Sequence, residues 1–337
     1  MPWREEPEQA LAPEQLERHD LRRRLLTVLV LGICAGTALL AVPDLRPVLQ
    51  QITAMNPALV VVAVALELAS CLSFVVIFRL FFRPVPSAMA REMAWSQMGS
   101  GALLPGGGVG SLAAGGWLLH LAGMPTRQIV RRSSGLFFLT SAINVIMLGA
   151  GGLFLLLGIG GGPDDVVRAG VPAVAGFTAI VGVLALPKVV RRIARGRPSP
   201  AWLDDLGAGI PAARDALLRP SWRLLGAFGY LLFDVSVLWT TLAAVGHVPP
   251  VAALVVAYLA GYLVNVLPIP GGIGILDAGL VGALALYGLP LPQAAAAVLV
   301  YHAVAFWIPT LGGMLAFTRL RPRLAQSQPQ ARTLPGS

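Results

Sequence analysis

LPGGGVG at residues 104–110 returns as IPGGIG at residues 269–274, and this recurrence organises the rest of the chain. A second match follows at the same offset of 165 residues (270 − 105), where GMP at residues 123–125 corresponds to GLP at residues 288–290. Both copies of the motif lie inside apolar sequence. Two copies of an apolar segment broken by Pro and Gly predict a duplicated membrane fold, and in transporters such paired interruptions point to the substrate site.

The composition indicates an integral membrane protein. Hydrophobic residues make up 56% of the 337 residues and charged residues only 12%, and the mean hydropathy is +0.75. A soluble domain could not cover so much apolar surface. The net charge of +9 does not predict nucleic-acid binding, because the arginines cluster between apolar runs, as in loops retained on the cytoplasmic side. Cys34 and Cys71 both lie in apolar runs, so no disulfide framework is expected.

The apolar runs predict an all-α polytopic membrane protein with six full spans and two split segments. The spans are expected at about 25–42, 57–82, 133–160, 166–187, 223–246 and 294–318, and the split segments at 87–122 and 252–288. Residues 1–24 carry both acids and bases, which predicts a cytosolic extension rather than a cleavable signal. A single transmembrane domain is expected over residues 25–320, and a disordered cytosolic tail over residues 321–337.

Charge placement predicts the topology. If each split segment is a re-entrant hairpin, every basic cluster falls on the cytoplasmic side and every base-poor loop on the other, with both termini in the cytoplasm. The first hairpin then enters from the cytoplasm and the second from outside. Repeat one (57–160) and repeat two (223–318) are therefore expected to be inverted, and the linker 161–222 between them contains a basic cytoplasmic loop, 188–222. Inverted repeats are the usual plan of secondary transporters that work by alternating access.

The two turns have the chemistry of an anion site. Irregular backbone at membrane depth is tolerated only where it is buried in protein or lines a wet cavity. There the unpaired N–H groups of the turns, and the positive dipole ends of the half-helices that follow, favour an anion such as a phosphate. The alternative is that the glycines only let two helices pack closely. The predicted substrate-binding residues are Pro105, Gly106, Gly107, Gly108, Gly110, Asn265, Pro270, Gly271, Gly272 and Gly274.

Three acids are expected at membrane depth. Glu67 and Asp234 lie mid-span, and the offset places Glu67 opposite residue 232, so these two acids should lie at similar depth. Asp277 lies in the exit half-helix of the second hairpin. A charge at this depth costs roughly 2.5–3.5 kcal/mol on insertion scales, so such residues usually face an internal cavity. Proton coupling or contact with a head group is the functional interpretation. The alternative is a neutral, hydrogen-bonded acid that only ties helices together.

His302, in the last span beside Tyr301, is a further candidate for proton coupling or head-group contact, although a lone histidine on an apolar helix is more often structural. The chain shows no metal-ligand spacing, no nucleophile motif and no phosphate-binding P-loop. The sequence therefore predicts no cofactor, no metal site and no catalytic activity.

NVLPIPGGIG at residues 265–274, followed by Asp277 and by YHAVAFWIP at residues 301–309, resembles the lysylphosphatidylglycerol synthase transmembrane-region family, whose members are also called flippase-like integral membrane proteins. The resemblance covers most of residues 25–320. It implies a bacterial or archaeal cytoplasmic-membrane protein that handles lipids, in some members by flipping an aminoacylated phospholipid. Family members often carry an acid after the first Pro-Gly turn, where this chain has Ser111. The soluble aminoacyltransferase domain of some relatives is absent from this chain, so lysyl-lipid synthesis is not expected.

These observations predict a lipid translocator whose coupling to protons is a hypothesis. It would hold an anionic phospholipid or polyprenyl-linked head group between the two hairpin tips while the lipid tails stay in the bilayer. Three alternatives remain. The first is a carrier for a small soluble anion. The second is an intramembrane enzyme, which would need a nucleophile or a metal set. The third is a non-transporting partner that anchors a glycosyltransferase through the loop 188–222.

Overall fold

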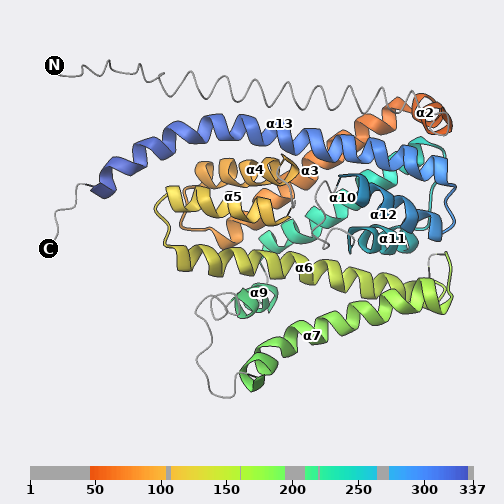
Figure 1. The fold of residues 1–337 in the computed structure, drawn as a ribbon, viewed down its shortest axis with the longest axis horizontal. Helices are drawn as coiled ribbons and strands as arrows, with labels where there is room; N and C mark the ends of the chain where they lie inside the picture. The colour runs from red at the N-terminus through yellow and green to blue at the C-terminus, as the bar shows by residue number, and fades with distance from the viewer. Residues whose placement is uncertain are drawn as a thin grey trace, which may run out of the picture. The chain divides into compact units, whose positions relative to one another are not determined.

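The computed structural model describes residues 46–103, 108–159, 161–193, 209–218, 221–263 and 273–332, and the regular structure in these ranges is helical. Contacts divide the chain into two units, Met1–Thr53 and Ala54–Ser337. The described part of the first unit is α2 (Arg46–Thr53). The second unit contains α3 (Pro57–Phe81), α4 (Ser87–Leu103), α5 (Gly108–Leu121), α6 (Thr126–Leu156), η2 (Val166–Gly170), α7 (Val171–Ile193), α9 (Gly209–Leu218), η3 (Trp222–Leu224), α10 (Leu225–Ala244), α11 (Val251–Leu263), α12 (Ile273–Leu286) and α13 (Leu291–Arg332) (Figure 1).

α3 begins at a local capping signal. The Asn56 side chain accepts a hydrogen bond from the Ala58 N–H at 3.0 Å, and Pro57 occupies the first turn, where its fixed φ suits a helix and its missing N–H is not needed. The backbone N–H of Asn56 also donates to the Ala244 carbonyl at 3.1 Å. This bond joins the start of α3 to the end of α10.

α3 and α10 pack against each other as an antiparallel pair. Beyond the bond at the start of α3, the Ser70 hydroxyl donates to the Tyr230 carbonyl at 3.1 Å. Further along, Gly226 of α10 lies so close to Ser73 that a Cβ added to Gly226 would fall 2.7 Å from the Ser73 carbonyl oxygen. Residue numbers along α3 therefore rise as those of the facing residues on α10 fall, which defines an antiparallel register. The small residues on α10 permit the close approach of the two helices.

The helices recur at the offset seen in the motif. Moved by 165 residues, both bounds of α5 coincide with those of α12, and the start of α6 coincides with the start of α13. The turns that end α5 and α12 match as well. Gly123 and Gly288 have φ of 82° and 92°, and their N–H groups donate to the His120 and Ala285 carbonyls, each at 2.9 Å. Both turns use the left-handed conformation in which glycine commonly ends a helix. The sequence duplication therefore extends to helix bounds and turns.

Each Pro-Gly motif separates two helices that fold back on each other. In the first pair, the Ser111 hydroxyl of α5 donates to the Gln97 carbonyl of α4 at 3.0 Å. In the second pair, Gly261 of α11 lies against Leu280 of α12. The split segments are therefore helical hairpins, although their tips at 104–107 and 264–272 lie outside the described residues. That the hairpins are re-entrant in a membrane stays a prediction.

Each hairpin packs on the last helix of the other repeat. α4 packs on α13, where a Cβ added to Gly313 would lie 2.7 Å from the Trp95 carbonyl oxygen and 2.8 Å from the Cα of Gly99. α11 packs on α6, where a Cβ added to Gly151 would lie 2.8 Å from the Val256 side chain. Small residues at such contacts let helix backbones approach. Such reciprocal packing is compatible with the predicted inversion of the two repeats, which stays a prediction.

Arginines gather at one end of this helical unit. Arg132 near the start of α6 donates to the Phe81 carbonyl at the end of α3, 2.6 Å away, and Arg323 of α13 pairs with Glu92 of α4 at 3.1 Å. We call this the arginine end. Its members are Arg79, Arg83, Arg91, Arg127, Arg131, Arg132, Arg223, Arg319, Arg321 and Arg323. At the opposite end, Arg168 is paired with Asp165 at 2.6 Å. The clustering agrees with the charge pattern from which the topology was predicted.

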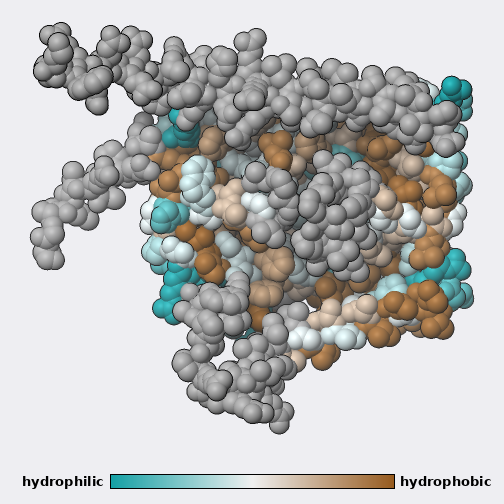
Figure 2. All heavy atoms as spheres, in the orientation of Figure 1, coloured by the Kyte–Doolittle hydropathy of each residue, from teal (hydrophilic) through white to brown (hydrophobic). Residues whose placement is uncertain are grey.

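Four described helices are long and apolar enough to cross a membrane. They are Pro57–Phe81, Thr126–Leu156, Trp222–Ala244 and Leu291–Leu324, and shorter apolar helices lie at Val166–Gly182 and Val251–Tyr262. Large hydrophobic side chains point outward from them, among them Val61 at 68% exposure and Val174 at 66%. Figure 2 shows hydrophobic side chains over the middle of this face and hydrophilic ones toward the ends. Such surfaces are suited to lipid rather than water. The chain is a multi-pass membrane protein.

The start of α6 and the end of α13 differ from the sequence prediction, and one predicted span cannot be compared with it. α6 begins at Thr126 rather than at 133, because its basic first turns continue the helix beyond the apolar run. α13 runs to Arg332, so residues 321–332 are helical rather than part of a disordered tail. Extending an existing helix needs no new nucleus, and burial of Leu320 and Leu324 packs the continuation. The predicted span at 25–42 lies outside the described residues.

Candidate functional site

Two acids lie at the middle of the α3–α10 pair. The antiparallel register places Glu67 level with Phe233 and Asp234, and the two carboxyl groups are close enough to repel each other when both are ionised. The offset of 165 maps Glu67 onto Leu232, which is adjacent to its partner in the register. When two antiparallel helices are related by a two-fold axis, the axis passes between them at the point where a residue of one helix lies opposite the corresponding residue of the other. If the two repeats are related by a two-fold axis, which stays a prediction, this register places the axis beside the two acids.

Asp234 accepts hydrogen bonds from two other helices. The Tyr258 hydroxyl of α11 donates to its Oδ2, and the Tyr301 hydroxyl of α13 donates to its Oδ1 at 2.9 Å. Tyr262, one turn beyond Tyr258, lies 2.9 Å from the Tyr301 hydroxyl, oxygen to oxygen. Hydrogen bonds to an ionised group are among the strongest in proteins. The Asp234 carboxyl thus joins α10, the second hairpin and α13.

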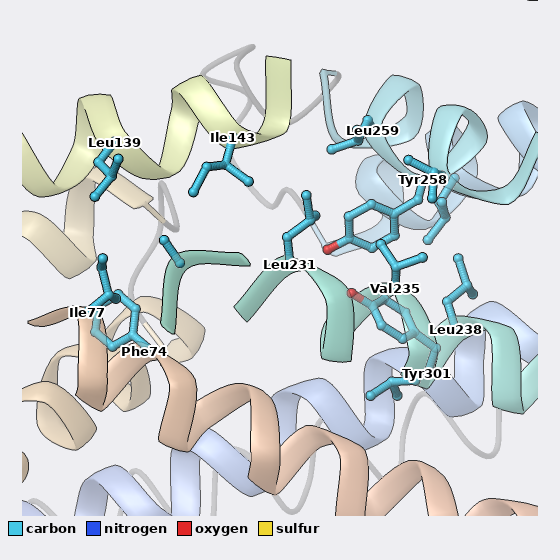
Figure 3. Close-up of a cluster of buried hydrophobic side chains, with 14 of the residues drawn as sticks. Phe74, Ile77, Leu139, Ile143, Leu231, Val235, Leu238, Tyr258, Leu259 and Tyr301 are labelled. Carbon is cyan, nitrogen blue, oxygen red and sulfur yellow. The ribbon is translucent and has the colours of Figure 1, made fainter. Parts of the chain in front are cut away.

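The surroundings of these tyrosines are apolar. Figure 3 shows Tyr258 and Tyr301 directing their hydroxyls toward the same region beside Leu231 and Val235 of α10. Tyr258 is 3% exposed and Tyr301 is fully buried, and their rings meet edge to face with centroids 6.3 Å apart. A low-dielectric environment strengthens hydrogen bonds that are made and penalises polar atoms left without a partner. The arrangement is suited to holding one charge at a fixed position.

Glu67 has fewer hydrogen-bond partners than Asp234. Its side chain is only 6% exposed, and the Cys71 thiol, one turn along α3, lies 3.6 Å from its Oε1. Its Oε2 is buried and has no hydrogen-bond partner among the described residues. Isolated carboxylates are costly to bury, so Glu67 is the less well supported of the two acids.

The structure describes only some of the other predicted site residues. Gly108 and Gly110 lie in the first turn of α5, and Gly274 and Asp277 lie in the first turns of α12. His302 lies on α13, with its ring centroid 5.3 Å from that of Tyr301. The remaining predicted substrate-binding residues, which lie outside the described residues, are Pro105, Gly106, Gly107, Asn265, Pro270, Gly271 and Gly272.

Sequence reasoning missed Tyr258 and Tyr262. Their spacing of four residues puts both hydroxyls on one face of α11, and ring centroids 4.7 Å apart confirm that they share it. Moved by 165 residues, Gln97 of the first hairpin falls at Tyr262. Gln97 is also buried, and its backbone carbonyl accepts from the Ser100 hydroxyl at 2.7 Å. The sequence signal that could have identified Tyr262 was a polar side chain at equivalent positions of both hairpins, Gln97 in the first and Tyr262 in the second.

A second polar contact lies at the end opposite the arginine end. Asp165 accepts from the Arg168 backbone N–H at 3.0 Å and from its Nε at 2.6 Å. These bonds, the backbone one first, hold the pKa of the Asp165 carboxyl below its usual value. The Tyr287 hydroxyl after α12 donates to the Arg168 carbonyl, and burial raises the pKa of Tyr287 to about 12. The far end of the second hairpin is thereby joined to η2.

Among the described residues, no group of three or more His, Cys, Asp or Glu side chains is arranged to hold a metal ion. Within these ranges the candidate site contains carboxyl, phenol and thiol groups, of which the carboxyl groups can hold a proton and the hydroxyl groups can donate and accept hydrogen bonds. The helix starts after the two Pro-Gly motifs add N–H donors that can bind an anion.

Comparison with known proteins agrees with this architecture. The chain is 35% identical over 91 residues to a "UPF0104 membrane protein" of Methanothermobacter thermautotrophicus, a match that spans 27% of this chain and 26% of that relative. A much longer match, over residues 25–313, is to the model of the lysylphosphatidylglycerol synthase TM region. It includes both hairpins and all four candidate spans except the last residues of α13. The chain therefore belongs to the lysylphosphatidylglycerol synthase TM region family.

Proposed function

We propose that the protein is a lipid translocase of the flippase type. It binds the anionic head group of a phospholipid or polyprenyl-linked lipid between the tips of its two hairpins, and the lipid tails remain in the bilayer. The two repeats are inverted and move against each other, which exposes the head group to each side of the membrane in turn. The family name, which refers to a lipid-modifying synthase, supports a lipid as the substrate.

The reciprocal packing of the hairpins carries this proposal. Because α4 packs on α13 and α11 packs on α6, a movement of either hairpin would be passed to the last helix of the other repeat. The hairpins also open toward opposite ends. Phe81 and Arg132 flank the first hairpin and are hydrogen bonded at the arginine end, whereas Tyr287, which follows the second, contacts Arg168 at the other end. Two oppositely directed hairpins at the junction of two repeats are the arrangement that alternating access requires.

The proposed head-group site uses the starts of α5 and α12. Each is a 14-residue helix that begins within a Pro-Gly motif, after its Pro-Gly pair. The first N–H groups of a helix have no partner within it, and the helix dipole favours negative charge there. Two such starts would favour a phosphate, and the arginine end, which we place in the cytoplasm of a bacterial cell, would attract anionic head groups.

The proposal is tested with the purified protein in proteoliposomes that contain fluorescent anionic phospholipids. Translocation is followed as the fraction of label protected from a membrane-impermeant quencher, with and without a proton gradient. We expect Asp277→Asn to abolish translocation, because Asp277 lies in the first turns of α12. Asp215→Asn, the same change at an exposed position of α9, serves as the matched control. Equal rates in the two variants would remove Asp277 from the mechanism.

A carrier for a small soluble anion gives a different result in the same vesicles. It would release entrapped inorganic phosphate but leave the distribution of labelled lipid unchanged. That outcome would contradict a lipid translocase, but it would agree with an anion site at the starts of α5 and α12.

A further inference from the structure

The geometry points to Glu67 as the site of a single exchangeable proton, with Asp234 as the fixed charge beside it. The proton-coupling part of this inference rests on the proposed function, whereas the proton site itself does not. Neither acid has an arginine or lysine among its described hydrogen-bond or ion-pair partners.

The two acids differ in how their negative charge is stabilised. Asp234 accepts from the hydroxyls of Tyr258 and Tyr301, one bond to each carboxylate oxygen. Glu67 receives only the weak donor of the Cys71 thiol, at 3.6 Å from Oε1. Two neighbouring carboxyl groups cannot both ionise cheaply, so one proton is shared unequally between them. The hydrogen bonds assign the charge to Asp234 and the proton to Glu67.

A second observation, the unpartnered Oε2 of Glu67, also supports a proton on this side chain. The side chain is buried at 6% exposure, and Oε2 has no hydrogen-bond partner among the described residues. Glu92, equally buried at 6% exposure, shows the contrast, because both of its oxygens lie within 3.2 Å of Arg323 Nη1. Glu92 is thus neutralised by a base, whereas Glu67 can be neutralised by a proton on Oε2.

The groups around Glu67 come from several elements. Cys71 of α3 contacts Glu67 itself. Tyr258 of α11 and Tyr301 of α13 contact the neighbouring Asp234 of α10. Tyr262 of α11 and His302 of α13 lie against Tyr301, and Tyr230 of α10 is close to both acids. Loss of the Glu67 proton would place two negative charges between α3 and α10, the first helices of the two repeats. Repulsion there would favour a rearrangement of the repeats. The proton would leave to water on the side to which the site opens, and the next proton would return from the other side.

The proton site is tested by infrared spectroscopy of the whole protein in lipid nanodiscs as the pH is changed. We expect a carboxylic-acid C=O band that persists at neutral pH and disappears at higher pH. Glu67→Gln should abolish this band, whereas Glu92→Gln, the matched control, should leave it unchanged. Cys71→Ala, which keeps the acid but removes the thiol donor, should shift the frequency of the band without removing it. A band that survives in Glu67→Gln, or one lost only in Asp234→Asn, overturns the assignment.

Coupling is tested in the lipid vesicles described above. In the wild type, a proton gradient should raise the rate of lipid translocation, and in Glu67→Gln the rates with and without the gradient should be equal. If the wild type moves lipid at the same rate with and without the gradient, coupling through Glu67 is wrong and the translocase stands. If no lipid moves in any vesicle, the translocase is wrong, and the infrared band still decides whether Glu67 holds the proton.

Discussion

A single carboxyl group connects three helices of this protein. Asp234 on α10 accepts hydroxyl hydrogen bonds from Tyr258 of the second hairpin and from Tyr301 of α13. We expect Tyr301→Phe to keep the edge-to-face ring contact but to lower the free energy of unfolding by about 1.5–3 kcal/mol, the range for a hydrogen bond to a charged group. Denaturant titration in mixed micelles measures the change.

Tyr287→Phe is the matched comparison for that variant. It removes a hydroxyl that donates to a neutral carbonyl, that of Arg168, so the expected loss is smaller, about 0.5–1.5 kcal/mol. Equal losses in the two variants would mean that Asp234 is not ionised in the folded protein.

Asp165 provides a pH-dependent prediction at the surface. Its pKa in the folded protein is lower than the ordinary value of 3.8, because the ionised carboxyl accepts hydrogen bonds from Arg168 and Val167. A lowered folded pKa contributes stability that is present above the unfolded value and is lost as the pH falls through the folded one. We therefore expect the amides of η2 to lose protection from hydrogen exchange below pH 3.8. Asp165→Ala, which has no side-chain acceptor for the Val167 and Arg168 N–H groups, should lose that protection at neutral pH too. The exposed Asp164→Ala should not.

At the level of helices, the close contact between α4 and α13 depends on glycine. A Cβ on Gly313 would lie 2.7 Å from the Trp95 carbonyl oxygen, and neither backbone can yield without moving a helix. We expect Gly313→Ala to lower the free energy of unfolding by about 1–3 kcal/mol, the usual cost of overpacking. Thermal unfolding followed by circular dichroism is the measurement.

Gly282 in α12 is the control for that substitution. A Cβ there meets no heavy atom within 4 Å, and alanine is the better helix former. Gly282→Ala should therefore be neutral or stabilise the protein by up to about 1 kcal/mol. If both glycines tolerate alanine equally, the contact between α4 and α13 is looser than the structure indicates.

At the scale of the whole molecule, the arrangement predicts on which side each hairpin is anchored. In a background without Cys34 and Cys71, single cysteines can replace exposed residues at both ends of each hairpin. Ser87 and Thr126 flank the first hairpin, and Val248 and Leu291 flank the second. We expect a membrane-impermeant maleimide to label Ser87→Cys and Thr126→Cys only from the cytoplasm, and Val248→Cys and Leu291→Cys only from outside. A hairpin that crossed the membrane would have its two positions labelled from opposite sides.

The sequence predicted much of this fold because duplication and hydropathy are local or periodic signals. The recurrence of Pro105-Gly106 as Pro270-Gly271 predicted both hairpins, and the long apolar runs predicted α3 and α10 within a few residues. The end of α13 was not predicted. Its polar residues after 318 resemble those of a solvated tail, and only their packing and the pair between Arg323 and Glu92 identify them as part of a helix.

The sequence by itself determined that the protein is helical, lies in a membrane and contains two related halves, because composition and repetition do not depend on how helices pack. Only the tertiary structure decided which groups Asp234 meets. Tyr258 and Tyr301 are 24 and 67 residues away from it in the chain, and they reach it only because α11 and α13 converge on α10. The same holds for Glu67, whose unpartnered oxygen is a property of the space between helices. Hydrogen bonds between distant residues are fixed by packing, which no local pattern encodes.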